Sequence, residues 1–558
     1  MKIFISHPGY SAKLSKKAIL RAPESFKIEE FTITDRNNGN TVFSGKIVRE
    51  GRVDKWKDWY FYSLDFSDLT NLGRYQIQID NLNSEAFNIV DTIFDKFLHN
   101  EILSYFKSNR SSGKWDRHDK QASFVGDRTE TKDVSGGWYD ASGDYSKYLT
   151  HLSYSNFMNP QQIPAVVWHM LKLVTNSENN GSKTALLRPR IMDEALFGAD
   201  FLVRMFDDAG YFYSVVFDKW SKDPAQREIC AYETQKGYKY DNYQAGYRQG
   251  AGIAIAALAK ASTMKENGEF SCSKYLEVAR KAFSHLEIHN TEYLDNGEEN
   301  IIDDYCALLA GIELYKATND HIHKEAADKR ATSLINRQMS DDNANNWFRA
   351  DNETRPYFHA AEAGFPIISL IEYLDISNDK ESVIHVIKNA LNYELNVTAE
   401  VNNPFGYARQ YTRDSNNIQK TAFFIPHNNE TGYWWQGENA RLASLASASY
   451  MGSILFKDDK EFSNKLVEYG NNQIHWILGL NPYDMCMQYG RGRNTPDYHE
   501  AWPSSPGGIC NGITSGFLDE NDIDFQPECA ATMDNTWRWG EQWIPHASWF
   551  LFAASILK

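Results

Sequence analysis

The sequence predicts a small β-sandwich followed by a large all-helical domain. Over residues 1–91, apolar and polar positions alternate with a period of two, as in half-buried strands. Beyond Asp91 the period changes to that of helices. The helical part is interrupted by long loops rich in Gly, Asp, Trp and Tyr, at residues 110–160, 400–436 and 481–538. Long loops inside a compact domain usually serve function, so we expect these to gather into one site.

The strands predicted within residues 1–91 are short and are separated by turn signals. These turns include RNNGN and DLTNLG, in which Asn and Gly tolerate positive φ. About seven such strands in about 90 residues are typical of an immunoglobulin-like sandwich. We therefore place an immunoglobulin-like domain at residues 1–91 and a second, helical domain at residues 92–558.

Roughly a dozen helical stretches follow the predicted sandwich. Several of them, such as GAGIAIAALAKAS, are apolar on nearly all sides, which indicates helices buried between other helices. The last predicted helix, EQWIPHASWFLFAASIL, begins at Glu541.

The charge balance excludes several kinds of partner. The chain carries 58 Lys and Arg residues against 74 Asp and Glu residues, a net charge of −16, and has no basic run. The electrostatic attraction that nucleic-acid binding needs is therefore missing, and an anionic membrane is an equally poor partner. The longest apolar stretch, residues 547–557, is far shorter than the roughly 20 residues that span a bilayer. Nothing in the sequence indicates the oligomeric state.

The cysteines and the N-terminal segment bear on the cellular compartment. The six cysteines lack CxxC spacing, which argues against a structural zinc site or a disulfide framework. The segment MKIFISHPGYSAKLSKKAILRAP lacks the apolar region of a secretory signal. We expect a cytoplasmic protein, or a secreted one if a signal has been removed from this sequence. The cysteines are Cys230, Cys272, Cys306, Cys486, Cys510 and Cys529.

The densest cluster of chemically capable residues is DVSGGWYDASGDYSKY, residues 133–148. It places the carboxylates of Asp140 and Asp144 among glycines and aromatic rings. Glycine allows close approach to a ligand, and rings such as those of Trp138 and Tyr139 offer flat faces on which a sugar can stack. The alternative is an Asp- and Gly-rich turn or a calcium loop, although the regular alternation of a calcium loop is incomplete.

A second cluster, PHNNETGYWWQGENARLASLA, lies at the entrance to a predicted helix. Its composition suits a polar, hydroxyl-rich ligand held against aromatic faces. The alternative is a buried aromatic cluster surrounded by solvated acids. The candidate ligand-binding residues here are His427, Tyr433, Trp434 and Glu438.

The third cluster is the C-terminal NTWRWGEQWIPHASWF, in which Glu541 stands among Trp537, Trp539 and Trp543. A carboxyl group flanked by indoles is desolvated, which raises its pKa and keeps it protonated near neutral pH. At the start of a helix, the same Glu541 could instead serve as a partner of the helix macrodipole.

Together the three clusters indicate glycosidase chemistry, which typically needs one protonated carboxyl and one ionised carboxylate. GGWYDASGDYSKY resembles the GGWYDAGDYGKY signature of glycoside hydrolase family 9, which includes many bacterial and plant cellulases. ETGYWWQGENARLASLA, LGLNPYDMCMQYGRG and WGE resemble later landmarks of that family. HPGYSAKLSKKAIL resembles the opening strands of the immunoglobulin-like module that precedes some of its catalytic domains.

This resemblance, which spans almost the whole chain, implies an (α/α)6 barrel at residues 92–558 and hydrolysis with inversion. It implies that Asp144 is the general base, that Asp140 helps to hold the attacking water, and that Glu541 is the general acid. We assign no metal ligand and expect no cofactor.

Two departures from the family pattern bear on these roles. Ser142 is an extra residue between the two aspartates, and it could shift them, Asp140 more than Asp144. After GRGRNTP, the cellulases typically carry a His-His-Arg run, whereas this chain reads DYHEAWPSSPGG, with His499 and Glu500. A carboxylate there suits an ammonium group, because a charge-assisted hydrogen bond is roughly twice as strong as a neutral one. In this respect the chain resembles the family's exo-β-D-glucosaminidase branch, unless Glu500 is simply a solvated loop acid.

The main interpretation is therefore an inverting β-1,4-glycosidase that releases glucosamine from chitosan oligosaccharides. The alternative is an endo-β-1,4-glucanase that acts on cello-oligosaccharides or cellulose. A non-catalytic sugar-binding protein would need the aromatic residues but neither Asp144 nor Glu541. A polysaccharide lyase would need clusters of Lys and Arg for its anionic substrate, and the candidate loops carry mainly acids.

Overall fold

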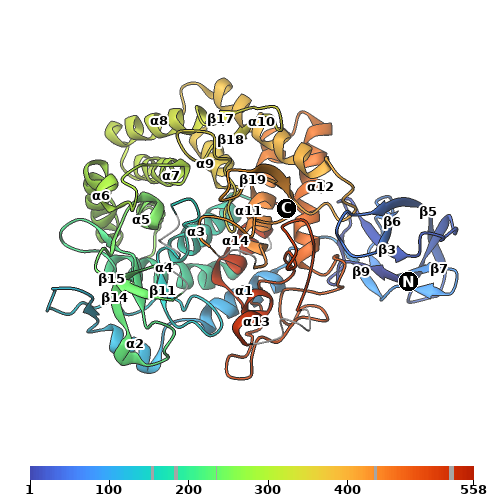
Figure 1. Ribbon diagram of the computed structural model, residues 1–558, viewed down its shortest axis with the longest axis horizontal. Helices are drawn as coiled ribbons and strands as arrows, with labels where there is room; N and C mark the ends of the chain where they lie inside the picture. The colour runs from blue at the N-terminus through green and yellow to red at the C-terminus, as the bar shows by residue number, and fades with distance from the viewer. Residues whose placement is uncertain (152–155, 181–185, 234–235, 433–435, 527–532, 558) are drawn as a thin grey trace.

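The computed structural model describes residues 1–151, 156–180, 186–233, 236–432, 436–526 and 533–557. A small β-sandwich, drawn in blue at one side of Figure 1, adjoins a much larger helical body. The last strand of the sandwich, β9 (Phe87–Val90), and the first helix, α1 (Lys96–Ser108), lie on either side of residue 91. Within the described residues, no helix is both long and apolar enough to cross a membrane.

The alternating pattern of residues 1–91 produces nine strands, all within the described part of the chain. Strand β5 pairs with β6 on one side and with β4 on the other, and a bulge between Arg49 and Gly51 interrupts its pairing with β6. Inward-facing apolar residues such as Ile33, Leu64 and Ile77 are fully buried between the strands. The strands are β1 (Lys2–Phe4), β2 (Tyr10–Ser11), β3 (Lys17–Ala22), β4 (Glu30–Asp35), β5 (Thr41–Arg52), β6 (Tyr60–Asp65), β7 (Gly73–Ile79), β8 (Leu82–Asn83) and β9.

Six inner helices of the helical body form a closed ring. Each inner helix packs against the inner helix that follows it in the chain, and the last inner helix packs back against the first. The inner helices are apolar nearly all round, as the sequence predicted, because they have neighbours on every side. They are α3 (Ile163–Asn180), α5 (Ala251–Ser262), α7 (Ile301–Thr318), α9 (Phe365–Tyr373), α11 (Asn439–Leu455) and α14 (Ile544–Ile556).

Six outer helices surround this ring, and each packs on an inner helix (Figure 1). They are amphipathic to different degrees, because one face meets the inner ring and the other meets solvent. The outer helices are α1, α4 (Arg188–Arg204), α6 (Cys272–His289), α8 (His321–Ile335), α10 (Lys380–Ala399) and α12 (Lys460–Ile477).

The connections between the helices, which include the predicted long loops, contain short helices and small sheets. The largest of these sheets has the strand order β10, β14, β13 and β11. It carries two segments that reach the candidate site, residues 138–148 and 217–223. The short elements are α2 (Gly113–Asp119), β10 (Ser123–Phe124), β11 (Lys147–Tyr148), β12 (Phe212–Tyr213), β13 (Val215–Phe217), β14 (Glu228–Glu233), β15 (Tyr238–Tyr240), β16 (Gln244–Ala245), β17 (Gln338–Met339), β18 (Trp347–Phe348), β19 (Gln410–Arg413), β20 (Gln419–Ala422) and α13 (Met533–Gly540).

A turn of the sandwich, residues 53–58, anchors it to the helical body. Trp56 is completely buried and packs against Phe405, Phe423 and Trp476, with ring centroids 4.8–6.3 Å away. Beside it, Lys55 and Lys57 both have positive φ, and the ammonium groups of both pair with aspartates of the helical body. Lys55 pairs with Asp519 and Lys57 with Asp524, 3.2 Å away, so the sandwich holds the loop that contains both aspartates.

A second anchor centres on Asp484, in the loop that follows α12. Its carboxylate pairs with Lys2 (2.9 Å) and His7 (3.0 Å) of the sandwich and with Arg493 (2.5 Å) of its own loop. Burial alone would raise the pKa of Asp484, but these hydrogen bonds hold it well below its usual range. The sandwich therefore fixes residues 484–493, which lead directly to the segment that carries His499 and Glu500.

We expect the substitution Trp56→Ala to lower the free energy of unfolding by about 3–5 kcal/mol, because it leaves a large cavity between the two domains. Denaturant titration followed by tryptophan fluorescence and circular dichroism would measure the loss. Val48→Ala, on an exposed strand position, is the control and should change stability by less than about 0.5 kcal/mol. Equal stabilities of the two variants would show that the turn does not anchor the domains.

Candidate active site

The segments that carry Asp140, Asp144 and Glu541 are distant in the sequence and adjacent in the structure. The backbone N–H of Ser142 donates to the carbonyl oxygen of Gln542 (2.9 Å). In return, the backbone N–H of Gln542 donates to the Ser142 hydroxyl (2.8 Å). This reciprocal pair of hydrogen bonds joins the turn between the two aspartates to the residue that follows Glu541.

Asp140 makes two further bonds to the same C-terminal segment. The indole N–H of Trp543 donates to the Asp140 carboxylate (3.0 Å), and the backbone N–H of Ile544 donates to the Asp140 carbonyl oxygen (3.0 Å). Ala141 and Trp543 also pair as an antiparallel bridge. The relative position of the aspartates and Glu541 is thus set by a short ladder of hydrogen bonds.

The prediction that the last helix begins at Glu541 is wrong. Helix α14 begins at Ile544, with Trp543 as its N-cap and Pro545 in its first turn, where the missing N–H of proline costs no hydrogen bond. Glu541 lies in the short link between α13 and α14. It therefore stands outside the helix, which weakens the alternative that it serves the macrodipole.

The extra residue Ser142 does not separate the aspartates. The N–H of Asp144 bonds to the carbonyl oxygen of Ala141 (3.1 Å), so the added residue is absorbed in a tight turn with Gly143 at φ +94°. One carboxylate oxygen of Asp140 and one of Asp144 lie within 4.8 Å of each other. Instead of displacing the pair, Ser142 supplies the hydroxyl that holds Gln542.

Asp144 accepts three hydrogen bonds. Its Oδ1 accepts from the backbone N–H of Ser146 (2.8 Å), and its Oδ2 accepts from the hydroxyl of Tyr148 (2.9 Å) and the indole N–H of Trp220 (3.0 Å). Burial and the nearby charge of Asp218 raise the pKa of Asp144, whereas the donors favour its ionised form. The carboxylate is therefore buried but well supplied with donors.

The carboxylate of Asp140 accepts fewer hydrogen bonds from described residues than that of Asp144 does. Its Oδ1 accepts from Trp543 and from the side-chain amide of Gln162. Burial and the charge of Asp144 hold its pKa well above the usual range of a carboxyl. Two adjacent carboxylates do not readily ionise together, and the three donors around Asp144 favour Asp144 as the ionised member of the pair.

Glu541 has the properties of a general acid. Its backbone is fixed, since its carbonyl oxygen accepts from the N–H of Asn511 (2.8 Å), but no described residue donates a hydrogen bond to its carboxyl group. Burial and the charges of Asp144 and Asp140 raise the pKa of Glu541 well above its ordinary value. The sequence predicted desolvation as a cause, and the charges of the two aspartates add to it.

His151 is a site residue that the sequence analysis missed. One of its ring nitrogens lies within 4.8 Å of carboxylate oxygens of both Asp140 and Asp144. Its Nδ1 lies 2.6 Å from the hydroxyl of Tyr232, and burial lowers the pKa of His151 to about 3, so the ring is neutral. Two carboxylates and an imidazole could hold a cation, but the same atoms surround the position at which an inverting glycosidase holds its attacking water.

Two residues predicted to contact the substrate lie beneath the site. Trp138 is fully buried between Phe106 and Phe197, and its indole N–H donates to Glu194 (3.2 Å). The hydroxyl of Tyr139 is engaged with the backbone of residue 112. Their rings fix the segment that carries the aspartates and are not available as platforms for a sugar.

In the second predicted cluster, the structure describes His427 and Glu438, and both side chains have protein partners. The ring of His427 is partly buried and bonds through Nε2 to the hydroxyl of Ser515 (2.8 Å). Glu438 is 3% exposed, and its carboxylate is engaged by Arg441 (2.5 Å) and by the N–H of Ile425 (2.9 Å). These bonds favour a structural role for Glu438 over the predicted contact with substrate. The predicted residues Tyr433 and Trp434 lie outside the described residues.

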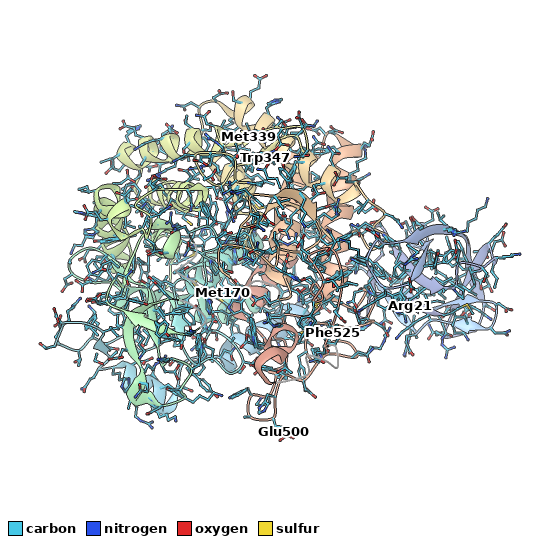
Figure 2. All side chains as sticks on the ribbon, viewed as in Figure 1. Arg21, Met170, Met339, Trp347, Glu500 and Phe525 are labelled. Atoms are coloured by element: carbon cyan, nitrogen blue, oxygen red, sulfur yellow. The ribbon has the colours of Figure 1, made fainter. Side chains whose placement is uncertain are left out.

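His499 and Glu500 lie in an exposed turn. The His499 ring packs on Trp502, with centroids 4.6 Å apart, and its Nδ1 accepts from the N–H of Ala501 (3.0 Å). A Cβ atom on Gly143 would lie only 3.2 Å from the Trp502 ring, so this ring packs closely on the turn between the two aspartates. Figure 2 shows Glu500 at the outer tip, pointing away from the body of the protein. This placement favours a solvated loop acid.

Two more residues near the carboxyl groups were not predicted. The Tyr498 ring lies beside Gly143, between the two aspartates, and burial and the charges of Glu541 and Asp144 raise the pKa of its phenol. The ammonium group of Lys222 lies 2.9 Å from the centroid of the Trp502 ring. Its pKa is lowered by burial, while the charges of Asp218 and Asp144 oppose that change. Tyr498 stands directly before the predicted His499 in DYHEAWPSSPGG, whereas Lys222 belongs to none of the segments that the sequence analysis singled out.

Comparisons with known proteins identify the family. Residues 94–509 match the sequence profile described as glycosyl hydrolase family 9, and residues 1–84 match that of a cellulase N-terminal ig-like domain. The chain belongs to glycosyl hydrolase family 9. The predicted order of an immunoglobulin-like sandwich and an (α/α)6 barrel is confirmed. The profile match ends before Glu541, so the assignment of the general acid rests on the geometry described above.

Curated relatives in the family resemble parts of the chain. A xyloglucan-specific endo-β-1,4-glucanase of Bacteroides ovatus is 26% identical over 371 residues, which are 60% of each chain. A cellodextrinase of Butyrivibrio fibrisolvens is 31% identical over 159 residues, 27% of this chain and 28% of its own length. The matched segments thus span less than two thirds of these relatives.

Solved structures of the family share the fold over the whole chain. A metagenome-derived glycoside hydrolase family 9 endoglucanase has a TM-score of 0.69 at 17% identity, covering 99% of this chain and 98% of its own. A family 9 protein of Bacteroides ovatus has a TM-score of 0.66 at 20% identity, with the same coverage.

Proposed function

We propose that the protein is an inverting glycoside hydrolase that cleaves β-1,4-linked glucans. The observation that carries this proposal is the convergence of three carboxyl groups with two different environments. Asp144 accepts three hydrogen bonds that favour its ionised form, whereas no described residue donates to the Glu541 carboxyl, and its pKa is strongly raised. One ionised base and one protonated acid are what glycoside hydrolysis requires.

The reaction follows from these states. Glu541 donates its proton to the glycosidic oxygen as the bond to the anomeric carbon breaks, and water attacks the opposite face of that carbon. Asp144 takes one proton from the water, and Asp140 orients it. The pair of aspartates suits a held water, because an inverting site leaves room for water between base and sugar.

The substrate we propose is a neutral glucan, which replaces the glucosaminidase interpretation of the sequence. The relatives described above are named as glucanases and a cellodextrinase, and none is named as a glucosaminidase. The argument for an amino sugar rested on Glu500, which is exposed at the tip of its turn. Lys222 instead brings a cation to the neighbourhood of Asp144, which disfavours a second ammonium group there.

The test is to incubate the protein in parallel with cello-oligosaccharides, xyloglucan and chitosan oligosaccharides and to identify the products. We expect products from the β-glucans and little or none from chitosan. Proton NMR should detect the α-anomer first, because an inverting site converts a β-linkage to an α-product. Glu500→Gln should leave the substrate preference unchanged. Preferential release of glucosamine, or an initial β-anomer, would overturn the proposal.

A further inference from the structure

The link between β13 and Pro224, residues 218–222, is strained. Lys219, Trp220 and Lys222 have φ values of +60°, +55° and +60°, although none of them is glycine. Residues with a side chain rarely adopt this conformation, and such strain persists only where surrounding contacts enforce it, often at functional sites. Three residues with positive φ among five consecutive ones indicate that contacts of this link hold its backbone in an unfavourable conformation.

Asp218 enforces this conformation. It is 1% exposed, and its Oδ1 accepts from the backbone N–H of Trp220 (3.1 Å) while its Oδ2 accepts from the backbone N–H of Lys222 (2.9 Å). Its Oδ1 also accepts from the hydroxyl of Ser146 (3.2 Å), the residue whose backbone N–H donates to Asp144. The strained link is therefore fastened to the segment that carries the general base.

This backbone conformation places the indole of Trp220 against the carboxylate of Asp144. The Nε1–H of Trp220 donates to Oδ2 of Asp144 (3.0 Å), beside the hydroxyl of Tyr148 on the same oxygen (2.9 Å). The Trp220 ring packs edge-on against Phe217, 5.0 Å away between centroids, which fixes its orientation.

The hydrogen bonds divide the two oxygens of Asp144 into different roles. A carboxylate oxygen has two lone pairs. Oδ2 accepts two bonds, from Trp220 and Tyr148, whereas Oδ1 accepts one, from Ser146. Among the described residues, the lone pair without a donor therefore lies on Oδ1.

We propose that Trp220 is a positioning residue for the general base. Its indole N–H, together with the Tyr148 hydroxyl, saturates Oδ2 of Asp144, so that the carboxylate stays ionised and takes the proton of water through Oδ1. This inference rests on the proposed function and deepens it, since it names the oxygen that acts and the side chain that selects it.

The sign of the expected pH effect follows from the groups around Asp144. Trp220 does not ionise, so its removal deletes a hydrogen bond to the charged form without changing any charge. The pKa of Asp144 should therefore rise, and the acid limb of the kcat/KM profile should move to higher pH. The titratable or charged groups that face Asp144 are Asp140, Tyr148, His151, Asp218, Lys222, Tyr498 and Glu541.

The test is Trp220→Phe, with Trp115→Phe as its matched control. Trp115 is also a buried indole in this region, stacked on Tyr145 at 5.1 Å, and within the described part of the chain it donates no hydrogen bond to Asp140, Asp144 or Glu541. We expect Trp220→Phe to shift the acid limb upward by about one pH unit, which is a tenfold loss of kcat/KM below that limb. The effect should fall on kcat more than on KM, and Trp115→Phe should leave the limb in place.

A second readout needs no substrate and separates this inference from the proposed function. In protein labelled with 13C at aspartate carboxyl groups, NMR titration follows the Asp144 signal, assigned by its loss in Asp144→Asn. The pKa of Asp144 should be higher in Trp220→Phe than in the wild type. Trp220→Gln, which keeps a neutral N–H donor two bonds from Cγ, should lie between them and also serves if the phenylalanine variant does not fold.

The outcomes differ clearly. An unchanged Asp144 titration in both Trp220 variants would overturn the positioning role. So would a rise in KM alone with a fixed acid limb, which would make Trp220 a sugar contact. A shifted Asp144 titration in a protein that hydrolyses no β-glucan would support the role of Trp220 while overturning the proposed substrate.

Discussion

Glu541→Gln should lower turnover on cello-oligosaccharides by about 10²–10⁴-fold, the usual contribution of a general acid. Glutamine keeps the shape of the side chain but cannot protonate the leaving oxygen. Activated aryl glycosides leave without that proton, so their turnover should fall much less. Because the wild-type acid works only when protonated, the alkaline limb of the pH profile should disappear on aryl substrates. Steady-state kinetics on both substrate classes, across pH, measures these effects.

The matched control is Glu500→Gln, the same chemical change at an exposed position. It should leave both substrate classes within about a factor of two of the wild type, since exposed substitutions are usually near neutral. Equal losses on activated and unactivated substrates in Glu541→Gln would remove Glu541 from the role of general acid.

Asp144→Asn should lower turnover on both substrate classes alike, by about 10²–10⁴-fold. Water must lose a proton whatever the leaving group is, and the asparagine amide cannot accept it. The contrast with Glu541→Gln therefore distinguishes base from acid without any structural measurement. The same kinetics on Asp140→Asn should show a smaller loss, because in the proposed mechanism Asp140 orients the water and does not take its proton.

The assignment of base and partner within the pair can be contradicted. A larger loss in Asp140→Asn than in Asp144→Asn would exchange the two roles, since the donors around Asp144 would then serve structure alone. Selective sparing of aryl substrates by Asp144→Asn would argue that neither residue activates water.

The fold could be predicted from the sequence because the periods of two in strands and of 3.6 in helices are patterns of neighbouring residues. Alternation over residues 1–91 and the all-apolar inner helices each follow from burial of neighbouring positions. The start of the last helix could not be placed, because Glu541 and Gln542 are good helix residues that tertiary bonds to residues 142 and 511 hold outside it. Propensity is a weak guide where such bonds compete.

The candidate site was predictable in part for a similar reason. Asp140, Asp144 and Glu541 belong to motifs, but motif composition does not say which way a side chain faces. Trp138 and Glu438 have the same chemistry as ligand-binding residues, yet the structure engages both with buried partners.

Trp220 lacked any such signal. Its approach to the base depends on positive φ and on Asp218, neither of which has a sequence pattern.

The closing of the inner ring has a consequence for how the enzyme is made. Glu541 lies directly before α14, the helix that packs on both α11 and α3 and so joins the end of the ring to its beginning. On the ribosome, the sandwich and the eleven inner and outer helices that precede α14 can emerge and pack before Glu541, the proposed general acid, has been translated. A nascent chain therefore has no complete set of carboxyl groups until its last helix docks. Activity acquired during synthesis would report the docking of that helix and not the folding of the preceding domain.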